Sequence, residues 1–115
     1  MQLNTANIFA QGGTTGPLTW SFIGGTLTIS GTGAMPDYGS VPWEAYKKQT
    51  TNLVIGSGVS SIGNYAFSGC SSLSNVNLPN SITSIGSSAF NNCSNLTTIA
   101  LPDGLIKIGS YAFNP

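Results

Sequence analysis

The chain of 115 residues contains no histidine, and only three of its residues are basic and three acidic. Histidine is the commonest general acid or base and the commonest metal ligand of proteins, so its absence removes the usual starting point for both kinds of site. The two cysteines cannot complete a tetrahedral zinc site by themselves. We therefore predict no metal site and no cofactor, and the sequence offers little support for catalysis.

Charge is also too scarce to attract polyanions. Charged residues make up 5% of the chain, the formal net charge is zero, and basic residues adjoin one another only at Lys47 and Lys48. No run approaches the ~18 apolar residues of a membrane span. We expect neither nucleic acid nor membrane insertion. Solubility then depends on Ser, Thr and Asn, a surface more often met in secreted or cell-surface repeat proteins, which favours an extracellular location.

The second half of the chain is built from a repeat of 23 residues. The block IGNYAFSGC, which starts at Ile62, recurs as IGSSAFNNC from Ile85, and a third copy begins as IGSYAF at Ile108. A degenerate earlier unit places the first coil near Thr51. Self-similarity at a fixed period of this length predicts a solenoid in which each unit forms one coil. The remainder of the unit repeats as well, with Leu73, Val76, Leu78, Pro79 and Ile82 matched by Leu96, Ile99, Leu101, Pro102 and Leu105.

Residues 73–78 and 96–101 read L-x-x-[VI]-x-L, the strand signature of leucine-rich repeats. Because strand side chains alternate between faces, Val76 and Leu78 should point inward, and Asn75 and Asn77 outward. The run 87–93 should form a helix of one or two turns or a 3-10 segment on the convex side. The predicted fold is a leucine-rich repeat solenoid with a short parallel sheet on its concave face. The repeated glycines mark a bend where positive φ or close backbone approach excludes a side chain: Gly63, Gly86 and Gly109.

Residues 1–50 are predicted to cap the solenoid, and residues 51–115 to form the repeats, the last one truncated. Apolar and polar residues alternate on both sides of Gly24-Gly25, so residues 18–30 should form a β-hairpin whose apolar side covers the first coil. Residues 42–48 carry proline near their start and lysines near their end, which favours a short helix.

Repeats of the form I-G-x-x-A-F-x-x-C-x-x-L-x-x-[IV]-x-L-P, preceded by LTWSF…GTLTISGTGAMPDY…VPWEAYKK, resemble the BspA-like leucine-rich repeat family over residues 18–115. The resemblance implies an extracellular, surface-displayed protein of host-associated anaerobic bacteria or parasitic protists, with several members tied to adhesion to host matrix proteins or cells. We therefore predict a non-enzymatic protein-binding or adhesion module. Asn92 and Asn95 match the N-glycosylation acceptor pattern, which matters only if the source is a eukaryote with a secretory route.

The candidate binding surface is the concave face, where solenoids commonly bind their partners. Its outward strand positions hold small residues, most of them able to donate and accept hydrogen bonds. These positions form two columns, Asn52, Asn75 and Thr98 in one and Val54, Asn77 and Ala100 in the other.

Two alternatives draw on residues of the cap. Tyr38, Trp43 and Tyr46 could offer stacking surfaces for sugars, which would make the chain a glycan-binding module. Asp37 and Glu44 could form the carboxylate pair of a hydrolase. The simpler interpretations are packing of the aromatics in the cap core, and a turn aspartate and a helix-start glutamate in solvent.

The two cysteines, Cys70 and Cys93, occupy the same position of adjacent coils. Stacked coils lie ~4.8 Å apart, whereas the Cβ atoms of a disulfide are separated by ~3.5–4.5 Å. We predict two buried free thiols that act as small apolar fillers.

The last unit begins at Ile108 and has no strand of its own. The strand before it, at 97–101, should then present unpaired backbone groups beside exposed apolar side chains, which is a template for association. We predict that the chain pairs end to end through residues around 96–113, by symmetric dimerisation or exchange of the last segment, or that it frays there.

Overall fold

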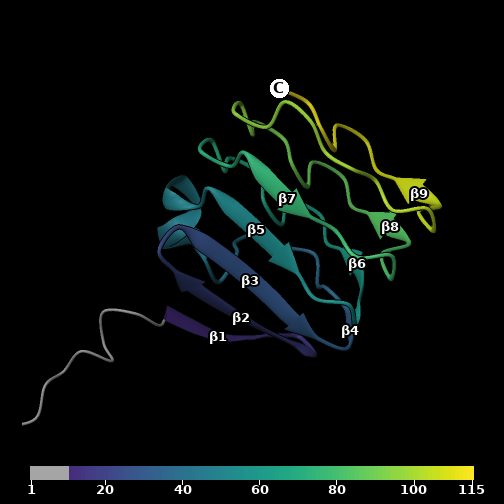
Figure 1. The fold of residues 1–115 in the computed structure, drawn as a ribbon, viewed down its shortest axis with the longest axis horizontal. Helices are drawn as coiled ribbons and strands as arrows, with labels where there is room; N and C mark the ends of the chain where they lie inside the picture. The colour runs from purple at the N-terminus through teal and green to yellow at the C-terminus, as the bar shows by residue number, and fades with distance from the viewer. Residues whose placement is uncertain (1–10) are drawn as a thin grey trace, which may run out of the picture.

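The computed structural model describes residues 11–115, so the first ten residues of the predicted cap lie outside the described part. The chain winds into a β-solenoid with strands on two of its sides (Figure 1). Sheet A consists, in spatial order, of β1 (Gln11–Thr15), β2 (Leu18–Ile23), β3 (Thr26–Gly31), β5 (Asn52–Ile55) and β7 (Asn75–Asn77). Sheet B consists of β4 (Gly33–Ala34), β6 (Val59–Ile62), β8 (Ser84–Ile85) and β9 (Lys107–Ile108).

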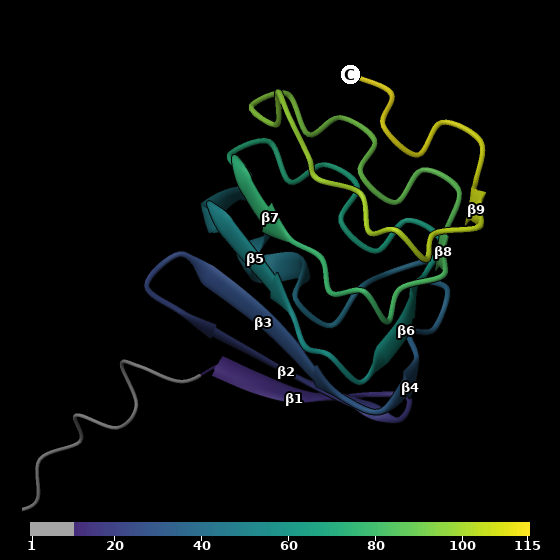
Figure 2. The same cartoon turned by 45° about the vertical axis from the view of Figure 1, so that its right-hand side comes forward.

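Equivalent repeat positions stack directly on one another. In sheet A, β5 and β7 are parallel, with Leu53 opposite Val76. In sheet B, Ile62 pairs with Ile85, and Ile85 pairs with Ile108. Figure 2 shows the two sheets rising side by side through the stack. The predicted solenoid of parallel strands is confirmed.

The predicted hairpin forms, and it stacks on the first coil as an extension of the sheet. β2 and β3 pair antiparallel around Gly24 and Gly25, whose φ values of 55° and 86° suit glycine. β3 then pairs in parallel with β5, and β4 pairs with β6, so the apolar side of the hairpin joins the core of the first coil by extending the sheet. Sheet extension satisfies the backbone groups along β3, which a face-on cover would leave unpaired. β1, which the sequence analysis did not predict, adds the outermost antiparallel strand.

The short helix predicted at 42–48 is a 3-10 helix, η2 (Glu44–Gln49), which lies between β4 and β5. Its first turn holds Glu44 and its last turn holds both lysines, an arrangement that complements the helix dipole. The ring of Tyr46 stacks on Phe22 of β2 at 4.8 Å between centroids. The helix thus fastens the hairpin to the first repeat.

A column of aromatic rings runs through the core along the stacking direction. Trp43, Phe67, Phe90 and Phe113 follow one another at centroid distances of 5.6, 5.5 and 5.5 Å. Trp43 is fully buried, and its indole Nε1 donates a hydrogen bond of 2.9 Å to the Ala66 carbonyl. Each buried ring of this size contributes roughly 1.5–3 kcal/mol. The tryptophan of the predicted cap is therefore the first member of the phenylalanine column.

The helical segment predicted at 87–93 is replaced by tight turns. Backbone N–H groups there donate alternately to the next coil and to the same turn: Ser88 to Ser110, Ala89 to Gly86, and Phe90 to Ala112. Residues at the αL conformation, such as Ser88 and Asn92 with φ of 56° and 61°, also interrupt any right-handed helix. A helix would need these N–H groups for its own hydrogen bonds, but several of them donate to the neighbouring coil. Stacking between coils is therefore favoured over local helix formation.

The repeated glycines stand where adjacent coils approach most closely. A Cβ atom on Gly63 would lie 1.7 Å from the Pro36 carbonyl oxygen, and one on Gly86 would lie 2.5 Å from the Asn64 nitrogen. Both distances are impossible for real Cβ contacts. Close approach of the backbones, and not a positive φ, is therefore the reason for glycine at these positions.

The strand predicted at 97–101 does not form among the described residues, although its pattern matches that of β7. Leu96 and Ile99 are only partly buried against the core, and the segment has one coil beside it instead of two. The same coil does pair in sheet B through β9.

The aromatic column predicts a contrast between two substitutions. Phe90→Ala removes a ring that is 1% exposed between two others, and we expect it to lower the free energy of unfolding by ~3–5 kcal/mol. Asn77→Ala removes an exposed side chain and should change it by no more than ~0.5 kcal/mol. Urea denaturation of both variants checks this. Equal midpoints would contradict the assignment of inward and outward positions.

Candidate binding surface

The outward side chains of sheet A form the candidate surface, and four of the six predicted residues meet there. Asn52 and Val54 on β5 lie in register with Asn75 and Asn77 on β7. The Asn75 Nδ2 donates a hydrogen bond of 2.9 Å to the Asn52 Oδ1. Asn75 and Asn77 are exposed, Val54 is 36% exposed, and Asn52 is half-buried.

The other two predicted residues, Thr98 and Ala100, do not join this array. Both are exposed, but their segment forms no strand, so the two columns end at β7. The placement of Thr98 and Ala100 depended on the strand at 97–101.

The surface extends instead in the opposite direction, over the hairpin. Thr26 and Thr28 of β3 are paired with Asn52 and Val54, so they continue the same two columns. On β2, the outward polar residues are Thr19 and Ser21, and the Thr19 Oγ1 lies 3.0 Å from the Ser30 Oγ. The alternation of apolar and polar residues in the hairpin was the signal for this extension, but it does not reveal which strand β3 joins. We call this array the sheet A surface; it consists of Thr19, Ser21, Thr26, Thr28, Asn52, Val54, Asn75 and Asn77.

The sheet A surface is electrically neutral and rich in hydrogen-bonding groups. β2, β3, β5 and β7 contain no charged residue, and hydroxyl and amide side chains fill most outward positions. Such a surface offers no long-range steering of a charged ligand. Its recognition would rest on shape and on short-range hydrogen bonds.

The cap aromatics are engaged in packing. Trp43 is fully buried, and Tyr38 lies edge-on to it at 5.4 Å with its hydroxyl hydrogen-bonded to the Thr15 Oγ1. Burial raises the pKa of Tyr38 above its ordinary value. Because Tyr46 stacks on Phe22, the aromatic faces that a sugar would need are largely covered.

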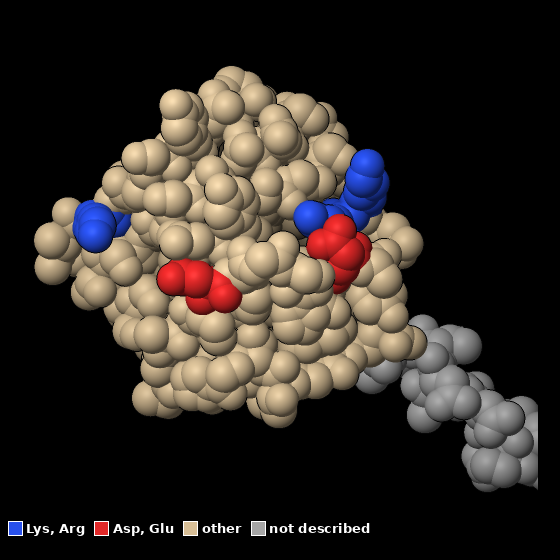
Figure 3. Space-filling view, turned by 180° about the vertical axis from the view of Figure 1, so that it is seen from behind, with Lys and Arg blue, Asp and Glu red and all other residues tan. Residues whose placement is uncertain are grey.

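The two cap carboxylates have separate structural partners. The Asp37 Oδ1 accepts a hydrogen bond of 2.8 Å from the Asn64 backbone N–H. The Glu44 Oε1 lies 3.3 Å from the Lys47 Nζ on η2. Figure 3 shows the acidic groups of that face as two distinct patches, one beside basic side chains. These contacts favour structural roles over a shared catalytic one.

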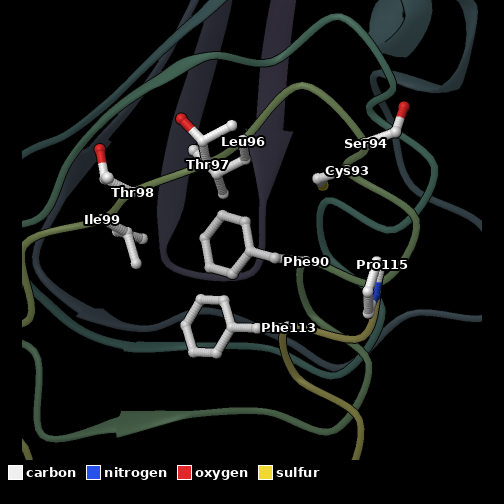
Figure 4. A pocket seen from close by; sticks show the side chains of 9 residues that line it. All are labelled: Phe90, Cys93, Ser94, Leu96, Thr97, Thr98, Ile99, Phe113 and Pro115. Atoms are coloured by element: carbon white, nitrogen blue, oxygen red, sulfur yellow. The ribbon is translucent and has the colours of Figure 1, made fainter.

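Two cavities lie away from the sheet A surface. One, of about 260 Å³, opens at the last coil between the stacked rings of Phe90 and Phe113 and the unpaired segment 96–99 (Figure 4). The other, of about 320 Å³, follows the glycine column past Asp37 towards Lys107. Within residues 11–115, no three His, Cys, Asp or Glu side chains cluster in a way that could hold a metal ion. No helix in that range has the length and apolar character to cross a membrane.

The prediction of two buried free thiols is confirmed. Burial raises the pKa of Cys70 to about 12, and the neighbouring Cys93 adds to the shift. Burial likewise raises the pKa of Cys93 to about 11, and its Sγ donates to the Phe67 carbonyl at 3.2 Å. Neither thiol is a nucleophile at neutral pH, because only the thiolate reacts.

Comparison with known proteins agrees with the repeat. A model described as BspA type leucine-rich repeat region (6 copies) matches residues 44–115. No curated protein matches the chain significantly.

Solved structures of bacterial proteins share the fold. A leucine-rich repeat protein from Eubacterium ventriosum superimposes with a TM-score of 0.82 at 31% identity, over 91% of this chain and 29% of that one. A leucine-rich repeat protein from Bacteroides ovatus superimposes with a TM-score of 0.59 at 28% identity, over 85% of this chain and 31% of that one. A leucine-rich repeat protein from T. pallidum superimposes with a TM-score of 0.55 at 23% identity, over 98% of this chain and 67% of that one. At this identity the likeness shows the fold alone. The chain thus spans about three tenths of the first two proteins.

The raised thiol pKa values predict slow labelling and a loss of stability at high pH. At pH 8 the native chain should react with a thiol reagent only as fast as it unfolds, and denaturation without reductant should release two thiols per chain. An unfolded thiol ionises near ~8.5, so the contribution to stability is complete below that pH and is lost as pH rises towards the folded values. A count of zero thiols would show a disulfide.

Proposed function

The chain belongs to the BspA-type leucine-rich repeat family, and on that basis we propose that it is a non-enzymatic module that binds another protein through the sheet A surface. The observation that carries this proposal is the register of the surface. Outward residues of β3, β5 and β7 stand in columns on a rigid sheet, with hydroxyl and amide groups exposed. A rigid array of this kind loses little entropy when a partner binds.

We propose further that the module acts outside the cell, in adhesion to a host matrix or cell-surface protein. Family membership supports this, and so does a surface whose solubility depends on Ser, Thr and Asn, with 5% of residues charged. The absence of enzymatic activity is supported by the separate partners of Asp37 and Glu44.

A substitution on the surface tests its role in binding. The double variant Asn75→Ala/Asn77→Ala removes two exposed amides from β7, and we expect it to weaken binding to a matrix protein at least ~10-fold. The measurement is surface plasmon resonance of the 115-residue chain against a panel of purified matrix glycoproteins.

The matched control is Asn80→Ala/Asn95→Ala, which removes two exposed amides outside the sheet. It should leave affinity unchanged. If no panel member binds, or if both double variants lose affinity equally, the sheet A surface is not the binding site.

We also propose that two copies of the 115-residue chain associate through residues 96–113. The last coil exposes Leu101 at 45%, Ile106 at 85% and Ile108 at 46%. Burying such side chains between copies removes apolar area from water. Light scattering should give a mass above the monomer, and Ile106→Asp should restore the monomer. A wild-type chain that is monomeric at high concentration would contradict the proposal.

A further inference from the structure

Two exposed tyrosines stand in one column of the turn segments, two coils apart. Tyr65 is 52% exposed and Tyr111 is 71% exposed, and the same position in the coil between them is Ser88. Eight of the ten aromatic side chains in residues 11–115 pack against another aromatic ring. Tyr65 and Tyr111 are the two that do not, so core packing does not explain them.

Conformational preference does not explain them either. Tyr65 and Tyr111 adopt φ values of 62° and 59°, in the left-handed region where an L residue with a large side chain is strained. The second left-handed position of the same turns holds Gly69 and Asn92, residue types that tolerate it. A bulky, exposed ring at a strained position indicates a function that the fold itself does not require.

The backbone holds the Cα atoms of the two tyrosines at a fixed spacing. The Tyr65 N–H donates to the Ser87 carbonyl at 3.0 Å, and the Ser88 N–H donates to the Ser110 carbonyl at 2.9 Å. Coils that are hydrogen-bonded in this way lie ~4.8 Å apart, so the two tyrosine Cα atoms are ~9.6 Å apart. One turn of a polyproline II helix, three residues at ~3.1 Å each, spans ~9.3 Å.

We propose that Tyr65 and Tyr111 form a docking site for a proline-rich segment of a protein in the polyproline II conformation, which lies along the solenoid axis and places residues i and i+3 on the two rings. Aromatic side chains recognise such segments through packing, without charge. The middle position of the column fits this pattern, because Ser88 is only 7% exposed. It would make no contact with the two residues of the bound segment that lie between i and i+3.

Fluorescence anisotropy of fluorescein-labelled decaproline, titrated with the 115-residue chain, tests the site. We expect saturable binding that Tyr65→Asn and Tyr111→Asn each weaken by about tenfold. Asparagine tolerates the left-handed conformation, so the denaturation midpoints of both variants should stay level or rise. Loss of affinity therefore cannot be attributed to unfolding. Ile23→Ala, at an exposed apolar residue of β2, is the control that should leave affinity unchanged.

A swap variant tests the spacing itself. Ser88→Tyr combined with Tyr111→Ser keeps two tyrosines in the column but brings them to ~4.8 Å apart. It should bind decaproline as weakly as Tyr111→Asn. Undiminished binding would show that the rings act as unspecific apolar surface and would overturn the proposal.

The choice of probe separates the possible ligands. A Gly-Ser decapeptide should bind at least about tenfold more weakly than decaproline, because it is not preorganised. No binding of decaproline at millimolar protein, or a chito-oligosaccharide that binds in its place and is lost in Tyr65→Asn, would overturn the proposal. The Asn75→Ala/Asn77→Ala variant should bind decaproline normally, so this site and the sheet A surface can fail independently.

Discussion

Hydrogen bonding between backbones of adjacent coils is the constraint from which the rest of the structure follows. It runs along sheet A and sheet B, and it continues through the turns, where alternate N–H groups such as that of Phe90 donate to the next coil. Coils this close leave no room for a Cβ atom at the glycine column. The same spacing stacks the core rings at about 5.5 Å, so the apolar contacts and the backbone bonds reinforce each other.

Polar side chains follow the same spacing. The Asp37 carboxylate accepts from the Asn64 N–H, and the Asn64 amide oxygen in turn accepts from the Ser87 N–H at 2.7 Å. On sheet A, Asn75 donates to Asn52 across one coil. Each bond fixes a side chain relative to its neighbour in the column, and this order gives a surface with few charges a definite pattern of donors and acceptors.

The sequence was sufficient for the register of the stack and for the side chains that repeat in its core. The 23-residue spacing predicted the parallel register, the buried phenylalanines and the free thiols. The repeat spacing could not show that β3 pairs with the first strand of the repeats, because β3 and β5 are offset by 26 residues. Nor could it show that Trp43 precedes Phe67 in the core column. The left-handed turns were missed because residues such as Tyr65 do not signal positive φ. The predicted helix was wrong because the N–H groups that it would need donate to a coil that is distant in sequence.

The columns of the solenoid divide according to whether their residues change along the stack. The core columns of the turn segments keep one residue type in all three copies of the repeat, because a different side chain there would collide with the next coil or leave a void. Columns that face solvent carry no such constraint, so a large or strained residue there needs another cause. Two of the columns to which we assign binding vary clearly along the stack, and function is therefore to be sought where the repeat is least regular. The invariant columns are Gly63, Gly86 and Gly109, then Ala66, Ala89 and Ala112, and then Phe67, Phe90 and Phe113, whereas the varying ones are Tyr65, Ser88 and Tyr111, and Thr28, Val54 and Asn77.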